Sequence, residues 1–177
     1  MATNADATDR QRIHSDLERV RVDLHQLVAG ATAPSLRRRT NGTRWTNGEL
    51  LWHMAFGFLI VRRLLPLVRL FGRLPEPFSR TFAAVLNAST RPFHHINYLG
   101  GVGGALIFRG PRLTRQLDHT IDVLHRGLEA ESEAALIRRM HFPVGWDPFF
   151  CDTMTLGEVY AYGPQHYDFH RAQLTLG

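Results

Sequence analysis

The chain has 177 residues, of which 44% are hydrophobic and 21% charged, and this predicts one globular domain spanning residues 1–177. Its 21 basic residues are all arginines and give a net charge of +5, but they are scattered and belong to no nucleic-acid motif, so we expect no nucleic-acid partner. The single cysteine, Cys151, excludes an internal disulfide. The polar N-terminus lacks the apolar core of a signal peptide, so we expect a cytoplasmic protein.

A first helix is predicted from about Thr8 to Val28. Its apolar residues recur every three or four positions, as in a helix that buries one face, and they are Ile13, Leu17, Val20, Leu24 and Leu27. Gly30 is a typical stop signal just beyond the last turn. His14 and His25 lie beside this apolar stripe, and we do not expect them to bind a metal.

The second predicted helix, from Thr46 toward Gly72, carries the first candidate site residue. Thr46 and Glu49 have the T-x-x-E spacing of a capping box, which fixes where the helix begins. One face of the helix then follows alternating spacings of three and four, through Leu50, His53, Gly57, Ile60 and Leu64. His53 is therefore expected to point inward.

The same helix is apolar enough to raise the question of a membrane span. Arg62, Arg63 and Arg69 interrupt the apolar run, so it is better interpreted as a buried helix, and we expect no membrane partner. Pro66 lies inside it and predicts a bend.

A long connection rich in proline and glycine follows, from about 72 to 110. It is expected to hold a short helix over 78–88 and a flexible, partly apolar flap over 98–108. The four glycines of the flap match neither a dinucleotide fingerprint nor a P-loop. His94 and His95 are adjacent and point in different directions, and histidines in loops are commonly solvated, so we do not expect them to be ligands.

A third helix is predicted over 111–128, followed by a weaker helical segment over 131–140. The loop from 141 to 152 that comes next is rich in aromatic residues. Its aromatic side chains either line the mouth of a pocket or close the end of a helical bundle, and the sequence does not separate these two interpretations.

The last predicted helix, 155–174, begins with a second capping box formed by Thr155 and Glu158. Its inward stripe consists of Leu156, Val159, Gly163, His166, His170 and Gln173. His166 and His170 are one turn apart on that face, so both can reach one ion. Pro164 predicts a local kink. We expect Gly57 and Gly163 to leave room for water or substrate in a widened bundle around the histidines.

Three histidines on the inward faces of two separately capped helices indicate a metal site. The alternative is that each is a hydrogen-bonded core residue, as single buried histidines often are. Three neutral imidazoles would leave an ion its full charge and an open position, which is typical of catalytic sites. The helices, with no strand-rich region among them, predict an all-α fold: a four-helix bundle with a long insertion between its second and third helices.

The segments that carry these histidines resemble the DinB-like superfamily. RWTNGELLWH, ending at His53, is similar to the start of the family's second helix, and HYDFHRAQL, beginning at His166, is similar to its last helix. In that family a four-helix bundle holds a divalent metal with one histidine from the second helix and two from the last. The resemblance therefore implies His53, His166 and His170 as ligands, whereas the connection over 72–110 departs from the compact family bundle.

Relatives in that family include metal-dependent thiol transferases that use mycothiol or bacillithiol, and a mycothiol-dependent maleylpyruvate isomerase. The resemblance implies a metal-dependent enzyme that activates a low-molecular-weight thiol for transfer to an electrophilic small molecule. A metal-dependent hydrolase and a non-catalytic, metal-stabilised binding bundle remain alternatives. Zinc is the default ion, with nickel, iron or manganese as alternatives, and a homodimer is compatible with each function.

Other polar residues near the histidines suggest fewer roles. Arg44 and Arg171 are candidates for holding a carboxylate of a ligand, although a surface role fits each as well. Asp168 lies between the two histidines of the last helix but projects away from their face. No catalytic acid or base can be assigned from the sequence.

Overall fold

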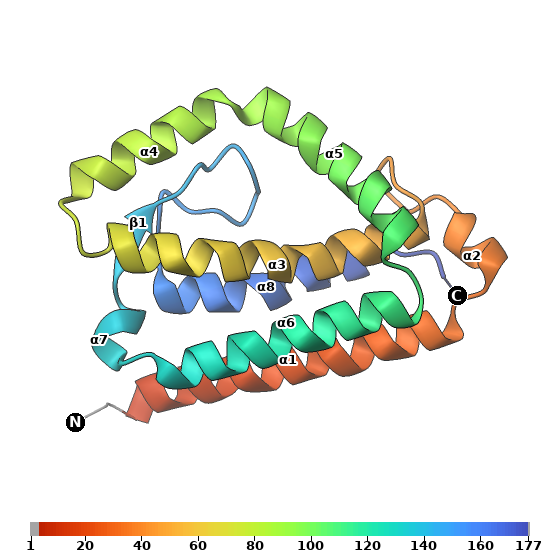
Figure 1. Ribbon diagram of the computed structural model, residues 1–177, viewed down its shortest axis with the longest axis horizontal. Helices are drawn as coiled ribbons and strands as arrows, with labels where there is room; N and C mark the ends of the chain where they lie inside the picture. The colour runs from red at the N-terminus through yellow and green to blue at the C-terminus, as the bar shows by residue number, and fades with distance from the viewer. Residues whose placement is uncertain (1–3, 177) are drawn as a thin grey trace.

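The computed structural model describes residues 4–176, with side chains from Asp9 onward. Within that range the chain forms eight helices and two short strands (Figure 1). In chain order they are α1 (Asn4–Gly30), α2 (Ala33–Arg37), α3 (Asn47–Phe71), α4 (Glu76–Ala88), α5 (Thr90–Ile107), α6 (Pro111–Ala130), α7 (Glu133–Leu136), β1 (Arg139–His141), β2 (Thr153–Thr155) and α8 (Leu156–Arg171).

The core lies between four long helices. α3 packs against α8 and α6, and α1 packs against α6 and α8, so the four run side by side in Figure 1. The stripe predicted for the first helix supplies Leu17, Val20 and Leu24, which are fully buried. The expectation of a predominantly helical fold is confirmed.

Both predicted capping boxes form and set the start of the helices that carry the candidate histidines. The Thr46 N–H donates to Glu49 Oε2 at 2.7 Å, and the Glu49 N–H donates back to Thr46 Oγ1 at 3.4 Å. Thr155 and Glu158 repeat the arrangement, at 2.7 and 3.2 Å. Because each pair satisfies backbone donors that the helix itself leaves unpaired, α3 begins at Asn47 and α8 at Leu156.

The segment 98–108 is not a flexible flap, as the sequence suggested: residues 98–107 form the second half of helix α5, and Phe108 is its C-cap. Together α4 and α5 form an arch over α3 (Figure 1). Trp52 on α3 donates its indole N–H to the carbonyl of Gly100 at 3.1 Å, and a Cβ on Gly104 would collide with the same indole. Gly104 against Trp52, and Gly101 against Trp45 in the same way, therefore allow α5 to lie close to these indoles.

The predicted helix over 131–140 is also wrong in its second half. α7 ends at Leu136, and Arg139–His141 forms strand β1, which pairs antiparallel with β2 so that Met140 lies opposite Met154. Beyond the strands the Phe142 N–H donates to the carbonyl of Asp152 at 2.9 Å. The pairing holds the two ends of the aromatic loop together, and a three-residue strand is too short to show in a sequence pattern.

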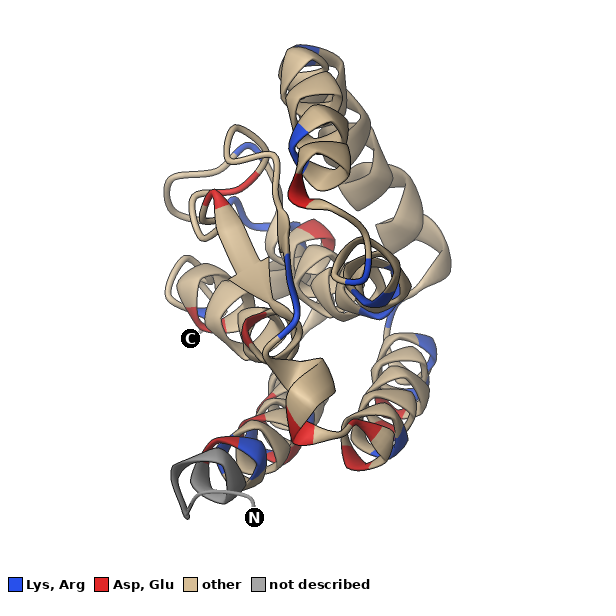
Figure 2. Cartoon of the chain, turned by 90° about the vertical axis from the view of Figure 1, so that its left-hand side faces the viewer, with Lys and Arg blue, Asp and Glu red and all other residues tan. Residues whose placement is uncertain are grey.

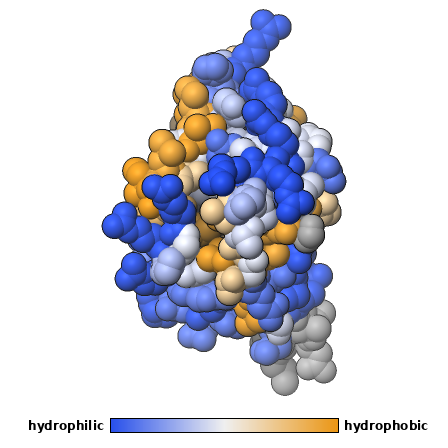
Figure 3. Space-filling model, turned by 90° about the vertical axis from the view of Figure 1, so that its right-hand side faces the viewer, coloured by the Kyte–Doolittle hydropathy of each residue, from blue (hydrophilic) through white to orange (hydrophobic). Residues whose placement is uncertain are grey.

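Charge and apolar surface are distributed unevenly over the fold. Charged residues of both signs gather on α1 and α6, whereas the arch carries few (Figure 2). Apolar side chains are exposed in the upper part of the face in Figure 3, at the level of the arch, and those exposed on α5 are Ile96, Leu99, Leu106 and Ile107. Among the described residues no helix combines the length and apolarity that a membrane crossing requires.

Candidate metal centre and its pocket

His53 lies in the second turn of α3 and is 5% exposed. The indole of Trp45, which precedes the helix, packs on its ring with the centroids 4.3 Å apart. The Nδ1 atom of His53 is buried and has no hydrogen-bond partner. A buried polar atom without a partner is costly and calls for a ligand to explain it.

His166 and His170 lie one turn apart on α8 and face His53. His166 is 4% exposed, and its Nδ1 is likewise buried without a partner. His170 is half-buried, and its Nδ1 is 2.7 Å from Oε1 of Gln173. That contact assigns the proton to Nδ1 and leaves the lone pair on Nε2, because an amide oxygen accepts only.

The three rings converge on one point between α3 and α8. One ring nitrogen from each residue lies within 4.8 Å of the others, and the ring centroids are separated by 4.6 to 5.1 Å. No other group of three such ligands gathers in this way among the described residues. The sequence prediction that these histidines meet is confirmed, and the donor set suits a divalent ion that accepts imidazole.

The surroundings keep these imidazoles neutral. Burial, followed by the charge of His170, lowers the pKa of His53 to about 3. Burial and then His53 and His170 lower the pKa of His166 well below its ordinary value, and burial lowers that of His170. Neutral imidazole is the form that binds metals, so the site is ready for a cation without first releasing protons.

The space that a side chain on either glycine of the inward stripes would take is filled by a neighbouring ring, although Gly57 also lines the cavity described below. A Cβ on Gly57 would lie 2.7 Å from Nδ1 of His166, and a Cβ on Gly163 would lie 2.8 Å from the ring of Phe58. Side chains already occupy both spaces. The glycines bring α3 and α8 close together, and α8 continues through Pro164.

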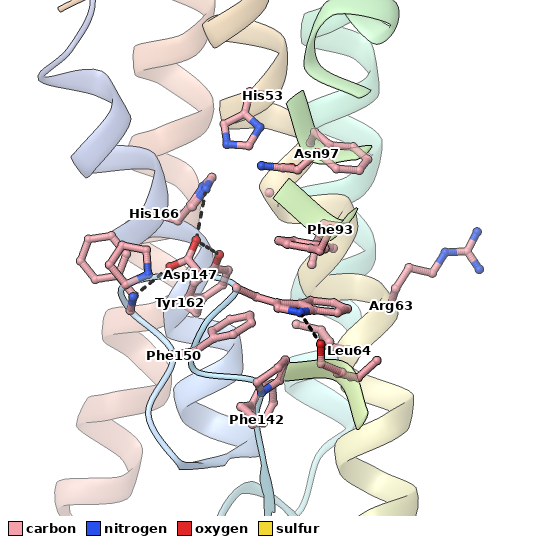
Figure 4. A pocket seen from close by; sticks show the side chains of 18 of the residues that line it. His53, Arg63, Leu64, Phe93, Asn97, Phe142, Asp147, Phe150, Tyr162 and His166 are labelled. Carbon is pink, nitrogen blue, oxygen red and sulfur yellow. Dashed lines mark hydrogen bonds and ion pairs between the residues drawn. The ribbon is translucent and has the colours of Figure 1, made fainter. Parts of the chain in front are cut away.

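A cavity of about 490 Å³ opens beside the histidines (Figure 4). It lies between α3, the arch and the loop 142–152, and most of its wall is apolar. Seven phenylalanines contribute to the wall, namely Phe56, Phe82, Phe93, Phe142, Phe149, Phe150 and Phe169. Of the two interpretations of the aromatic loop, the structure therefore supports the pocket.

The loop is attached to the arch by polar and aromatic contacts. Trp146 donates its indole N–H to the carbonyl of Leu86 at 2.8 Å and stacks on Phe93 with the centroids 3.9 Å apart. The Gly145 N–H donates to Oδ1 of Asn87 at 3.0 Å. The segment 72–110 thus forms one side of the pocket and holds the loop that forms another.

Asp147 is the candidate site residue that the sequence analysis did not single out. Its Oδ2 accepts from the Tyr162 hydroxyl at 2.9 Å and lies 3.8 Å from Nε2 of His166, and its Oδ1 accepts from the Phe149 N–H at 2.9 Å. Burial and the Asp147 carboxylate raise the pKa of Tyr162, which therefore stays a donor. The only signal in the sequence is a single acid inside the aromatic run 142–150.

The remaining histidines lie outside this centre. His25 pairs with Asp118 at 2.9 Å, and His14 stacks on His125. His141 lies between two carboxylates, those of Glu76 and Asp152, each 3.1 Å away. Burial lowers the pKa of His141, but the hydrogen bonds to these carboxylates outweigh it, and the net shift is upward.

The polar residues considered in the sequence analysis take different places. Asp168 forms an ion pair with Arg19 at 2.8 Å, and Arg171 pairs with Asp23 at 2.9 Å. Arg44 stacks over the ring of Tyr98, 4.3 Å from its centroid. Arg44 also lines a small cavity, of about 180 Å³, which shares Trp45 and Asn97 with the cavity beside the histidines. Arg171 is therefore engaged in an ion pair with Asp23, whereas Arg44 lies beside the site.

Comparison with known proteins gives one result. The sequence model of the DinB superfamily matches residues 16–174. This range includes all three histidines and every residue that lines the cavity beside them. No curated protein and no solved structure matches the chain significantly.

Proposed function

The chain belongs to the DinB superfamily, and on this premise we propose that it is a metal-dependent enzyme that activates a low-molecular-weight thiol, of the mycothiol or bacillithiol type, for transfer to an electrophilic small molecule. The observation that carries the proposal is the cluster of three neutral histidines, two with unpartnered buried nitrogens, beside an apolar cavity.

His53, His166 and His170 would hold the metal, with zinc as the default ion and nickel, iron or manganese as alternatives. Bound by three neutral ligands, such an ion would keep its charge and would lower the pKa of a thiol beside it, so that the nucleophilic thiolate would be available near neutral pH. The protein then needs no nucleophile of its own. Cys151 is exposed, outside the cavity wall, and is assigned no role.

The surrounding side chains would orient these ligands. Trp45 packs on the ring of His53 and limits its rotation, and Gln173 accepts from Nδ1 of His170. Groups that fix the orientation of a ligand ring in this way increase metal affinity. The apolar wall of the cavity would keep bulk water from an electrophile and from a thiolate, which limits competing hydrolysis.

Arg44 is proposed to bind an anionic group of the thiol. The small cavity that Arg44 lines adjoins the cavity beside the histidines at Trp45 and Asn97. A thiol whose anionic group is held by Arg44 would therefore extend toward the histidines. Arginine suits this role because its planar guanidinium pairs with a carboxylate through two parallel hydrogen bonds. Arg171 is not proposed for it, since Asp23 already occupies its guanidinium.

A second function, metal-dependent hydrolysis, is favoured by one observation. Asp147 places a carboxylate oxygen 3.8 Å from His166, where it would accept a hydrogen bond from a water molecule and orient it toward a substrate. In this alternative, water takes the place of the thiol and turnover does not depend on any thiol.

The test is consumption of thiol by the metal-loaded protein with a panel of electrophiles, in the presence and absence of chelator. The proposal expects turnover that requires both metal and thiol and that an Arg44→Ala variant reduces through a higher KM for the thiol. Arg62→Ala, which removes an exposed arginine of α3 that does not line either cavity, is the matched control. Turnover without thiol would support the hydrolase, and no turnover under any condition would contradict both.

A cytoplasmic location and a homodimer remain predictions of the sequence. We propose both for this chain: the single cysteine fits a reducing compartment, and the apolar residues exposed on α5 could lie in an interface between copies.

A further inference from the structure

We propose that the cavity beside the histidines binds an uncharged small molecule that carries a planar aromatic ring. This molecule would be the electrophile of the proposed reaction, so its role as a substrate rests on the proposed function. The binding step itself depends only on the cavity.

The shape of the wall favours a flat ring. Phe93 and Trp146 stack nearly parallel, with 7° between their planes, and line the side formed by α5 and the loop. Phe150 contacts both Phe142 and Tyr162 at centroid distances of 5.0 to 5.3 Å. A ring inserted among these groups would find both faces and edges to pack against, as aromatic pairs prefer.

The charges of the wall disfavour an ionic ligand. Apart from the histidines, the ionisable groups that line the cavity are Arg63, Asp147 and the strongly hydrogen-bonded Tyr162. Arg63 is exposed and extends away from the other side chains in Figure 4. In the metal-free protein, a ligand carboxylate in the cavity would lose its water, find no buried cation, and face the carboxylate of Asp147.

A cation is disfavoured for a different reason. The oxygens of Asp147 already accept from the Tyr162 hydroxyl and the Phe149 N–H, and a single buried ion pair with this carboxylate would not offset the cost of removing an organic cation from water. Apart from the histidines, polar recognition is left to Asn97, whose amide points from α5 toward His53 in Figure 4. One neutral amide in an apolar wall is suited to orienting a carbonyl or hydroxyl group.

The size of the cavity sets a further limit. Its volume of about 490 Å³ falls within the usual range of small-molecule sites, roughly 300 to 1,000 Å³. A ligand with a single aromatic ring or two fused rings would fill a substantial part of the cavity, whereas the cavity would not enclose a peptide or a nucleotide.

The test measures binding to the full chain after chelator treatment, by calorimetry. The probes are 2-naphthamide, 2-naphthoate and 2-naphthylmethylammonium, which share a ring system and differ in charge. We expect 2-naphthamide to bind about tenfold more tightly than either ion. Equal or tighter binding of the anion or the cation would overturn the assignment of an uncharged ligand.

Variants locate the binding. Phe93→Ala removes one aromatic wall and is expected to weaken 2-naphthamide binding at least about fivefold. Phe149→Leu keeps much of the volume but loses a ring, so it tests aromatic contact with less risk to folding. The matched control is Phe78→Ala on α4, since Phe78 is 58% exposed and does not line the cavity. The proposal would be overturned if Phe93→Ala and Phe149→Leu both kept wild-type affinity for 2-naphthamide, or if only the Phe78→Ala control lost affinity.

The outcome can be separated from that of the proposed function. Binding of 2-naphthamide without thiol-dependent turnover of any electrophile would uphold the ligand class and contradict the thiol transfer. Thiol transfer to electrophiles that are all charged or aliphatic, without binding of 2-naphthamide, would uphold the enzyme and overturn the ligand class.

Discussion

Replacing Gly57 with alanine should weaken metal binding far more than it weakens the fold. The added Cβ would lie 2.7 Å from Nδ1 and 3.1 Å from Cε1 of His166. Ordinary contact begins near 3.4 Å, so the imidazole must retreat by about 0.7 Å or the helices must separate. Metal sites tolerate displacements of only about 0.2 Å in ligand distance.

Two opposing effects act on stability. Alanine is better than glycine inside a helix by about 1 kcal/mol, whereas overpacking a filled site costs about 1 to 3 kcal/mol. The net change in the free energy of unfolding of the metal-free Gly57→Ala protein is therefore small, about 0 to 2 kcal/mol of destabilisation. The displaced ring should lower metal affinity by about 10- to 100-fold, the range typical of a disturbed ligand orientation.

Two measurements on the same variant separate these effects. Competition with a chromophoric chelator gives the metal affinity, and urea unfolding followed by circular dichroism, in the presence of chelator, gives the stability. Gly103→Ala is the control, because no atom lies within 4 Å of its added Cβ; it should gain up to about 1 kcal/mol and keep its metal affinity. Wild-type metal affinity in Gly57→Ala would refute the packing of Gly57 against a metal-binding His166.

Three further predictions concern the packing of α5, the Asp147–Tyr162 pair in the cavity wall, and the ion pairs of His141. Gly104→Ala should destabilise the protein by about 1 to 3 kcal/mol in urea unfolding, because its Cβ collides with the indole of Trp52; a gain in stability would contradict the packing of α5. Asp147→Ala should cost about 1 to 3 kcal/mol by leaving the Tyr162 hydroxyl without its acceptor, and a double-mutant cycle with Tyr162→Phe should show coupling, which additive effects would rule out. His141→Asn should destabilise the protein more at pH 6 than at pH 8.5. A histidine with a raised pKa stabilises the fold below pH 6.5 and loses that contribution as pH rises through its folded pKa. An equal loss of unfolding free energy at both pH values would contradict the ion pairs.

The parts of the site that the sequence predicted are those set by local spacing. A capping box fixes a helix start through residues three apart, and helical periodicity then assigns each later residue to a face. For this reason the sequence alone predicts that His53, His166 and His170 lie on inward faces. Their mutual distance could not be derived from spacing alone, since it depends on how α3 and α8 pack.

The parts that the sequence analysis missed depend on contacts between distant segments. The glycines of α5 suggest flexibility when considered alone, but two tryptophans, Trp45 and Trp52, pack against them in the fold. The space beside Gly57 is filled for the same kind of reason, by a histidine ring from α8. Asp147 lies in a loop whose position is set by β1, β2 and the arch, so no local pattern could place it beside His166.

Metal content tests the central claim most directly. The wild-type chain, a His166→Ala, His170→Ala double variant and a His25→Ala control would be treated with chelator, reloaded with zinc, freed of excess ion and analysed for bound metal. We predict about one ion per chain in the wild type and in the control, whose histidine pairs with Asp118 away from the site, and none in the double variant. Equal metal content in all three proteins, or no metal in the wild type, would contradict the account.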